Sequence, residues 1–301
     1  MAKKILITGA SGLIGTRLTA LLIERGHGVA HLGRAKKEDT IATFFWDPAQ
    51  GKIDASCLAQ IDAIVHLAGA SVAGGRWSAR RKTEIEASRI QSTRLLMETL
   101  KNNSHTVRAV VCASAIGYYG LDDDKIFVES DAPGHDFLAE VTRRWEIEAD
   151  TLTSPGIRTS KIRIGIVLSE KGGALTEMAK PIRWGVGSPL GSGKQFLSWI
   201  HIDDLCQVFV KAIEDDLMKG TYNATAAWCS NEEMTRAIAR VLGKPLWLPA
   251  VPSVILKIIL GEMAGIVLKG TRVSGEKIRS SGFQFEFNDL DRALKNLIAK
   301  Y

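Results

Sequence analysis

Apolar residues in this chain form two kinds of pattern, which alternate along its first 169 positions. Short continuous apolar runs are typical of buried strands, and longer segments with apolar residues every three or four positions are typical of amphipathic helices. Strands and helices in alternation predict right-handed crossovers and a doubly wound parallel sheet in an α/β fold. The strand-like runs cover residues 3–8, 27–33, 43–46, 62–69, 107–114 and 157–169, and the helical patterns cover residues 13–26, 78–100 and 136–152.

The pattern changes after Ser169. Glycine is dense between residues 171 and 195, which predicts a long loop with a short helix. From Asn231 onward the chain is mostly helical, with one strand-like piece at residues 283–287. Between these parts, residues 196–205 resemble a strand that enters a helix, and residues 220–226 resemble a short strand.

Composition adds little to this picture. The 301 residues are 46% apolar and 24% charged, as in an ordinary soluble protein, and the net charge of +6 is compatible with an anionic small ligand. This charge is too diffuse to indicate nucleic-acid binding, and the basic stretch 78–84 has no aromatic stripe or known module beside it. No pair among the four cysteines has metal-ligand spacing, so we expect no metal site.

Two apolar segments bear on the location of the protein. The run that follows Lys4 ends at Thr8 and is too short for a signal peptide. Residues 254–270 are strongly apolar, but Lys257 and Glu262 interrupt them, which favours a buried or interface helix over a membrane span. We therefore expect a cytoplasmic protein without a membrane partner, with the matrix of an organelle as the alternative location.

Three glycines, Gly9, Gly12 and Gly15, follow the first predicted strand and open the first predicted helix. In this context the first glycine allows a tight turn, the second lets the backbone approach a pyrophosphate, and the third lets helix and strand pack closely. Free amides at the helix start favour the anion. The expected cofactor-binding residues of this loop are Gly9, Ser11, Gly12, Leu13, Ile14 and Gly15.

The glycine loop extends the fold prediction to a Rossmann fold. We expect a dinucleotide-binding domain at residues 1–169, whose sheet is completed by segments near residues 200–226. A smaller, mostly helical substrate-binding domain would occupy residues 170–301 and pack against the first domain.

The residues at the end of the second predicted strand indicate whether the cofactor is NAD(H) or NADP(H). Proteins that prefer NAD have an acid there, but this chain has Gly33 and Arg34, with Lys36 and Lys37 close behind. A guanidinium in this position can pair with a 2′-phosphate and stack on the adenine, which predicts NADP(H). A solvated basic turn is the alternative, since Glu38 and Asp39 follow.

Several motifs together resemble the extended short-chain dehydrogenases/reductases. These are the glycine spacing, HLAGA after the fourth strand and ASAIGYYG after the fifth. More narrowly, GGRWS, SRIQSTRLL, RRWE, PLGSGKQFLSWIHIDDL and LPAVPSVILKIILGE resemble the atypical NAD(P)-dependent epimerase-family proteins, over nearly the whole chain. Many relatives form a dimer through helices like those at residues 78–100 and 136–152, so the resemblance implies a possible homodimer.

The resemblance also implies further cofactor contacts. Leu67, Ala68 and Gly69 would pass under the adenosine and the pyrophosphate, and the backbone around Ile166 would meet the carboxamide. Arg89 stands where typical relatives have Asn and could reach a phosphate, while Glu84 could orient Arg89 or bond a ribose hydroxyl. A surface salt bridge on the helix is the alternative for both.

The catalytic pair of the superfamily is missing. Typical members use a Tyr and a Lys four residues later, whose charge lowers the pKa of the Tyr. Phe137 and Val141 occupy these two slots, and no Tyr-x-x-x-Lys occurs in the chain. Ser114 stands where relatives place a substrate-binding serine, and Tyr118 or Tyr119 could supply the acid; Ser114 and Tyr118 are the catalytic candidates. The alternative is that the tyrosine rings only pack the loop. His201 is a second titratable candidate, whose alternative role is to anchor the junction of a strand and a helix.

Two functions remain open. The first is an NADP(H)-dependent oxidoreductase or sugar-nucleotide-epimerase-like enzyme with a displaced acid and an unknown small-molecule substrate. The second is a non-catalytic NADP(H)-binding sensor or scaffold. For the enzyme, we expect a substrate pocket framed by Ser114, Tyr118 and the glycine-rich residues 185–193.

Overall fold

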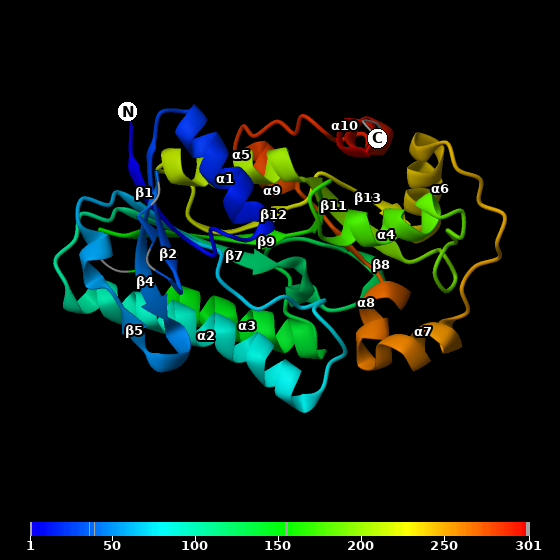
Figure 1. Cartoon of the computed structure of the whole chain (residues 1–301), viewed down its shortest axis with the longest axis horizontal. Helices are drawn as coiled ribbons and strands as arrows, with labels where there is room; N and C mark the ends of the chain where they lie inside the picture. Colours follow the sequence, from blue (N-terminus) through cyan, green and yellow to red (C-terminus); the bar gives the residue numbers. More distant parts are fainter. Residues whose placement is uncertain (1, 36, 39, 154–155, 299–301) are drawn as a thin grey trace.

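The computed structural model of the chain describes residues 2–35, 37–38, 40–153 and 156–298. Its larger sheet has the strand order β12-β9-β7-β6-β1-β2-β4-β3, with β5 paired to β4 (Figure 1). Neighbours from β12 to β4 are parallel, so the predicted doubly wound parallel sheet is confirmed. The strands are β1 (Lys4–Thr8), β2 (Gly28–Gly33), β3 (Lys37–Glu38), β4 (Ala42–Asp47), β5 (Lys52–Ile53), β6 (Ala63–His66), β7 (Ala109–Ala115), β9 (Arg158–Ile164) and β12 (Gly220–Ala224).

Helices cover both faces of this sheet. The pair α1 (Leu13–Glu24) and α5 (Ile202–Glu214) lies on one face, and the pair α2 (Ala79–Asn102) and α3 (Phe137–Asp150) lies on the other (Figure 1). On β1, Ile5 and Ile7 join the core on the α1 side, and Leu6 between them joins the core on the α2 side. Both faces of β1 are therefore buried, which explains why its sequence is continuously apolar.

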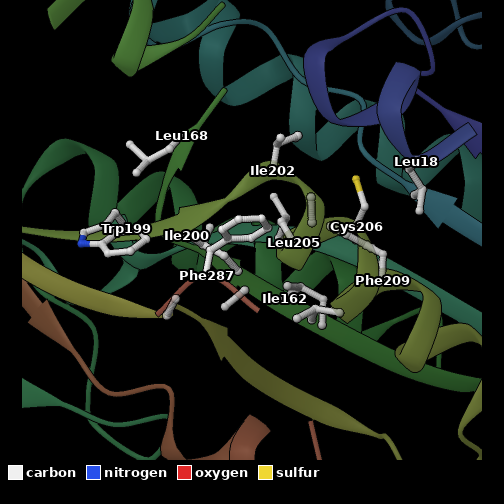
Figure 2. Packing of buried hydrophobic residues seen from close by; sticks show 14 of the residues in the cluster. Leu18, Ile162, Leu168, Trp199, Ile200, Ile202, Leu205, Cys206, Phe209 and Phe287 are labelled. Atoms are coloured by element: carbon white, nitrogen blue, oxygen red, sulfur yellow. The ribbon is translucent and has the colours of Figure 1, made fainter. Parts of the chain in front are cut away.

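A second, smaller sheet has the order β10-β11-β14-β8, with β13 paired to β11. Trp199 and Ile200 of β11 share one core with Leu18 of α1 and Phe209 of α5, so the two sheets are packed as one body (Figure 2). This sheet was not predicted, because its short strands come from five separate parts of the chain. They are β8 (Asp122–Phe127), β10 (Ile166–Leu168), β11 (Phe196–His201), β13 (Ala227–Ser230) and β14 (Thr271–Val273).

The remaining helices confirm the helical character of the chain beyond Asn231 and the short helix in the glycine-dense loop. No helix in the described part of the chain is long and apolar enough to cross a membrane. The apolar residues 254–270 instead form two short helices separated by a 3-10 turn at Gly261–Met263. The helices are α4 (Ala174–Arg183), α6 (Asn231–Leu242), α7 (Ser253–Leu260), α8 (Ala264–Leu268), α9 (Glu276–Ser280) and α10 (Leu290–Ile298).

Two strand predictions were wrong. The run 157–169 is not one strand, because it divides at Gly165 into β9 of the larger sheet and β10 of the smaller one. A Cβ at Gly165 would lie 2.8 Å from the carbonyl oxygen of Ser198, so only glycine fits where the chain changes sheets.

Residues 283–287 form no strand. The amides of Glu286 and Phe287 donate instead to the carboxylate of Asp204, each at 2.9 Å, so a side chain takes the place of a strand partner. The Phe287 ring stacks on the buried His201 at 3.9 Å. The alternating apolar pattern is thus satisfied by burial of aromatic rings from an irregular segment.

Candidate cofactor and substrate site

The glycine loop connects β1 to α1 and packs against the segment that follows β6. Gly9 has φ +67°, and a Cβ there would lie 2.9 Å from the carbonyl carbon of Leu67. A Cβ at Gly15 would lie 2.5 Å from the carbonyl oxygen of Gly9. Both positions therefore require glycine for packing alone, as the spacing predicts.

Gly12 differs from the other two glycines. Its φ is −76°, and a Cβ there would meet only the carbonyl oxygen of Gly9 within 4 Å, at 3.2 Å. It is the N-cap of α1, with no side-chain cap and no acid in the first turn. Ser11 and Gly12 are exposed, and Leu13 and Ile14 are half-buried. The positive end of the helix is thus left for an anion from outside the chain.

A buried hydrogen-bond network holds the segment opposite the glycine loop. The Thr8 hydroxyl oxygen accepts the amides of Leu67 and Ala68, each at 3.1 Å, and lies 2.8 Å from Nδ1 of His66. On the other side of the ring, Nε2 of His66 lies 3.0 Å from the Thr93 hydroxyl, which donates to the carbonyl of Arg89 at 2.8 Å. The network therefore ties β1 and β6 to α2.

The network defines the protonation state of His66. Two amides use the lone pairs of the Thr8 oxygen, so its hydroxyl donates to Nδ1, and Nε2–H donates to Thr93. This arrangement fits a neutral imidazole. Burial lowers the pKa of His66 to about 4, in agreement with the hydrogen bonds. From the motif HLAGA the sequence analysis predicts cofactor contacts only for Leu67, Ala68 and Gly69. It does not predict the structural role of His66.

Arg89 lies against the turn formed by Gly69 and Ala70. A Cβ at Gly69 would lie 3.3 Å from Cζ of Arg89, whose Nη1 donates to the carbonyls of Ala70 at 3.1 Å and Ile85 at 2.8 Å. Burial, together with the charge of Arg81, lowers the pKa of Arg89 to about 10. Among the described side chains no carboxylate pairs with it. A half-buried cation without an acid partner is suited to an anionic ligand.

Glu84 does not orient Arg89. Its carboxylate accepts from Arg81 at 2.7 Å, and its side chain is 56% exposed, so that prediction was wrong. The spacing of three residues on α2 favours the pair with Arg81, because both side chains lie on one helix face. A contact between Glu84 and a ribose hydroxyl stays a prediction.

Arg34 is exposed at the carboxyl end of β2. Gly33 before it is packed closely, since a Cβ there would lie 3.0 Å from Cγ2 of Thr43. Lys36 and Asp39 lie outside the described residues, as do the side chains of the two residues between them. The contact of Arg34 with a 2′-phosphate therefore stays a prediction.

A cavity of about 370 Å³ is lined by strands of the smaller sheet, the 3-10 turn Ile116–Tyr119, the start of α3 and the region of α8. Three aromatic side chains line it, Trp77, Phe137 and Phe196, together with Ile116 and Ile166. Its charged lining residues are Asp136, Glu262 and Lys269. Phe137 begins α3 and packs against Trp77, with ring centres 5.0 Å apart.

The cavity is not framed as the sequence predicts. Neither Ser114 nor Tyr118 nor any residue of the loop 185–193 belongs to its lining. The Ser114 hydroxyl is 3% exposed and donates to Glu146 of α3 at 2.6 Å, because Ser114 points towards the helix. Tyr118 lies under the guanidinium of Arg163, 3.5 Å from the ring centre. Their catalytic roles stay untested predictions.

Glu146 is the centre of a buried charge network. Its two carboxylate oxygens accept from Arg163 at 2.8 Å each. Arg163 also donates to the Tyr119 hydroxyl at 2.8 Å, which donates to Asn223 at 2.7 Å. Burial raises the pKa of Tyr119 to about 12. The network links α3, β9 and β12 to the 3-10 turn Ile116–Tyr119, which supplies part of the cavity wall.

The sequence did contain a signal for this network. Lys161 and Arg163 stand inside a strand that is buried on both faces, and charged residues are buried only when they are paired. Lys161 does pair, with Asp150 at 2.6 Å.

Comparison with known proteins agrees with this geometry. The model of the NAD dependent epimerase/dehydratase family matches residues 5–225. The chain belongs to this family. Residues 251–297 match a domain of unknown function, DUF1731. The predicted membership of the extended short-chain dehydrogenases/reductases is confirmed.

Relatives in the epimerase family match the whole chain. Epimerase family protein YfhF of Bacillus subtilis is 37% identical over 98% of both chains. The structure of human epimerase family protein SDR39U1 (isoform 2) with NADPH matches at a TM-score of 0.90 and 30% identity, over 99% of this chain and 100% of that one. A structure titled nucleoside-diphosphate sugar epimerase, from Corynebacterium glutamicum, matches at a TM-score of 0.81 and 30% identity. The match covers 99% of this chain and 59% of that one.

This member of the epimerase family departs from the typical pattern at its catalytic slots. Phe137, which the sequence predicts in the tyrosine slot, lines the cavity, and Val141, which it predicts in the lysine slot, is buried at 3% exposure. Neither side chain can exchange a proton. A member with these residues needs another group for any proton transfer.

Proposed function

We propose that this protein is an NADPH-dependent oxidoreductase or epimerase-like enzyme that acts on a small molecule. The observation that supports this most is the close packing of the glycine loop next to an uncapped helix start: Gly9 packs against the Leu67–Ala68 backbone, and Gly15 packs against Gly9 and Ala10. The human relative at a TM-score of 0.90 was solved with NADPH, which favours the phosphorylated cofactor.

The residues of the loop fit a dinucleotide. Gly12 and the free amides of Leu13 and Ile14 would hold the pyrophosphate, because no side chain of α1 competes for them. The backbone of residues 67–69 would follow the adenosine. Arg34, at the end of β2, would pair with the 2′-phosphate.

Two charged residues of α2 and the backbone that follows β9 would complete the cofactor site. Arg89 would bind a phosphate, since its cation has no acid partner among the described side chains and lies against Gly69. Glu84, which is largely exposed, would reach a ribose hydroxyl. Ile166 lines the cavity and would present its backbone to the carboxamide.

A bound nicotinamide would supply or accept hydride, and this chain must then move one proton. Asp136 is the carboxyl that the cavity offers next to Phe137. Its Oδ1 accepts the amide of Ala139 at 2.9 Å as the N-cap of α3, so the carboxylate is held in place. We propose Asp136 for proton exchange, with Ser114 and Tyr118 as the candidates predicted from the sequence.

A second function is favoured by one observation. Phe137 and Val141 remove the usual proton donor, and the Ser114 hydroxyl is already bonded to Glu146. A chain that binds NADPH without turnover, as a redox sensor or scaffold, would have the same cofactor loop and no need for an acid.

Steady-state kinetics separates the two functions. NADPH oxidation is followed with a panel of carbonyl compounds and nucleotide sugars, for the wild type and for Asp136→Asn, Ser114→Ala and Tyr118→Phe. Asn keeps the helix cap but cannot donate a carboxyl proton, so we expect Asp136→Asn to lower kcat by about 100-fold. Fast turnover that survives all three substitutions contradicts the proposed site, and no turnover with any substrate favours the non-catalytic binder.

The predictions on assembly and location belong to this proposal. We propose a homodimer through α2 and α3, a cytoplasmic location, and no nucleic-acid or membrane partner. Sedimentation of the purified protein tests the dimer, and a monomer at all concentrations contradicts it.

A further inference from the structure

The charges of the cavity oppose a strongly anionic ligand. Of its three charged lining residues, Asp136 and Glu262 are acids and only Lys269 is a cation. Glu262 is paired with Lys82 of α2, which leaves one acid and one cation to face a ligand. A diphosphate has at least two negative charges and needs a surplus of cations around it. The cavity is therefore suited to a ligand without net charge.

Hydrogen-bonding groups in the lining are largely used within the protein. The Ser198 hydroxyl donates to the carbonyl of Thr271 at 2.8 Å and accepts the amide of Val273 at 2.9 Å. The Thr271 hydroxyl donates to the carbonyl of Gly120 at 2.6 Å. A sugar ring would bring several hydroxyl groups into this space, and each would lose its bond to water without a replacement.

Aromatic rings supply the walls instead. Trp77 comes from the loop before α2, Phe137 from the start of α3 and Phe196 from β11. Leu121, Leu138 and Ile266 fill much of the remaining surface. A volume of about 370 Å³ lies at the small end of the range for pockets that bind drug-sized molecules. Such a space fits a body of one or two fused rings, and a nucleoside diphosphate joined to a sugar would have to extend beyond it.

We propose that this cavity takes an uncharged, mainly apolar carbonyl compound with an aromatic or fused-ring body, and that it excludes nucleoside-diphosphate sugars. The ring system would pack among Trp77, Phe137 and Phe196. The carbonyl oxygen would accept a hydrogen bond from Asp136 in its protonated form, and Asp136 would give that proton to the oxygen as the cofactor supplies hydride to the carbonyl carbon. This substrate class rests on the proposed NADPH-dependent function, but the cavity itself is made by protein side chains.

Ligand-detected saturation-transfer NMR tests the proposal with 1-indanone as the apolar carbonyl probe and UDP-glucose as the nucleotide-sugar probe. Each is titrated into the wild-type protein with and without NADPH, and NADPH binding is followed separately by its fluorescence. We expect 1-indanone to bind with a dissociation constant of about 1 mM or lower, as its size allows. We expect an excess of UDP-glucose to leave the saturation-transfer signal of 1-indanone unchanged.

The variants Phe137→Leu and Phe285→Leu form a matched pair. Both remove a ring and keep an apolar side chain, but Phe285 packs on Phe283 and is not part of the cavity lining. Phe137→Leu should weaken 1-indanone binding by about three- to tenfold, and Phe285→Leu should leave it unchanged. Trp77→Leu repeats the test on a second wall in case the first variant folds poorly.

Displacement of 1-indanone by UDP-glucose would overturn the proposal, as would absence of 1-indanone binding or equal binding by the two phenylalanine variants. Failure of NADPH to bind is a different result. If 1-indanone still binds and depends on Phe137, the proposed cofactor function fails and the assignment of the cavity stands.

Discussion

The glycine loop and the apolar cavity, which we propose as the cofactor half and the substrate half of one site, are built in different ways. The loop is made of backbone, with Gly9 and Gly15 in contact with main-chain atoms and Gly12 at an uncapped helix start. The cavity is made of side chains such as Trp77, Phe137 and Ile266, which come from distant parts of the chain.

This difference determines what each half recognises. Backbone amides and a helix end favour phosphate groups, which many dinucleotides share. Side chains in the cavity favour shape and polarity, which differ from one substrate to the next. The cofactor half can therefore follow its family, while the side chains of the cavity, Phe137 among them, can differ from those of its relatives.

The largest expected effect is on folding stability, and it tests whether the buried side-chain network around Glu146 stabilises the part of the fold that carries the cavity. Glu146→Ala leaves Arg163 buried without its carboxylate partner, while Lys161 keeps Asp150, so the free energy of unfolding should fall by about 3–5 kcal/mol. Urea denaturation measures this change. Glu140→Ala on the same helix is the control, because Glu140 forms exposed ion pairs with Arg143 and Arg144. Equal stability of the two variants would show that the buried network does not support the cavity.

The backbone half is tested by two glycine substitutions. Gly12→Val should keep the fold but lower NADPH affinity by about 100-fold or more, since the branched side chain occupies the space of the pyrophosphate. Gly15→Val should instead disrupt folding, because its Cβ would lie 2.6 Å from Cα of Ala10. Circular dichroism and NADPH titration distinguish the two. A folded Gly12→Val protein that binds NADPH normally contradicts the assignment of the loop.

Acid should destabilise the folded protein through His66, whose hydrogen-bond network holds the segment opposite the glycine loop. The pKa of His66 is about 4 in the folded protein and 6.5 in an unfolded chain, so the unfolded chain binds more protons between these values. The free energy of unfolding should therefore fall by about 3 kcal/mol as the pH is lowered from about 6.5 to 4.

His66→Gln cannot titrate and should flatten this part of the stability curve. The exposed His135 gives the matched control, His135→Gln, which should keep the slope of the wild type. If His66→Gln and the wild type lose stability in parallel, another group is responsible for the acid effect.

The smallest effect concerns cofactor choice. Arg34→Ala should weaken NADPH binding by about ten- to a hundredfold and leave NADH binding unchanged, since only NADPH has the 2′-phosphate. Arg236→Ala serves as the control, because Arg236 is exposed and pairs with Glu232 on the distant α6. If Arg34→Ala lost the same affinity for NADPH and for NADH, Arg34 would not recognise the 2′-phosphate, and this assignment would be contradicted.

Much of the cofactor half could be predicted from the sequence because its determinants are local. Gly9, Gly12 and Gly15 lie within one turn and one strand end, and their backbone geometry follows from the residue type. The helix that carries the expected Tyr and Lys slots could also be found, since α3 begins at Phe137, while the assignment of Phe137 and Val141 to these slots stays a prediction.

The cavity could not be predicted in the same way. Ser114 was placed at the end of the correct strand, but the direction of its side chain depends on strand register and on Glu146, 32 residues later. The second sheet joins strands as short as β10 and β14, which leave little pattern in the sequence. Tertiary packing, and not local propensity, decides both features.

Calorimetric titration of the wild-type protein with NADPH and NADH tests the central claim most directly. The account predicts that NADPH binds at one site per chain, about ten- to a hundredfold more tightly than NADH. Absence of NADPH binding, or tighter binding of NADH, would contradict it.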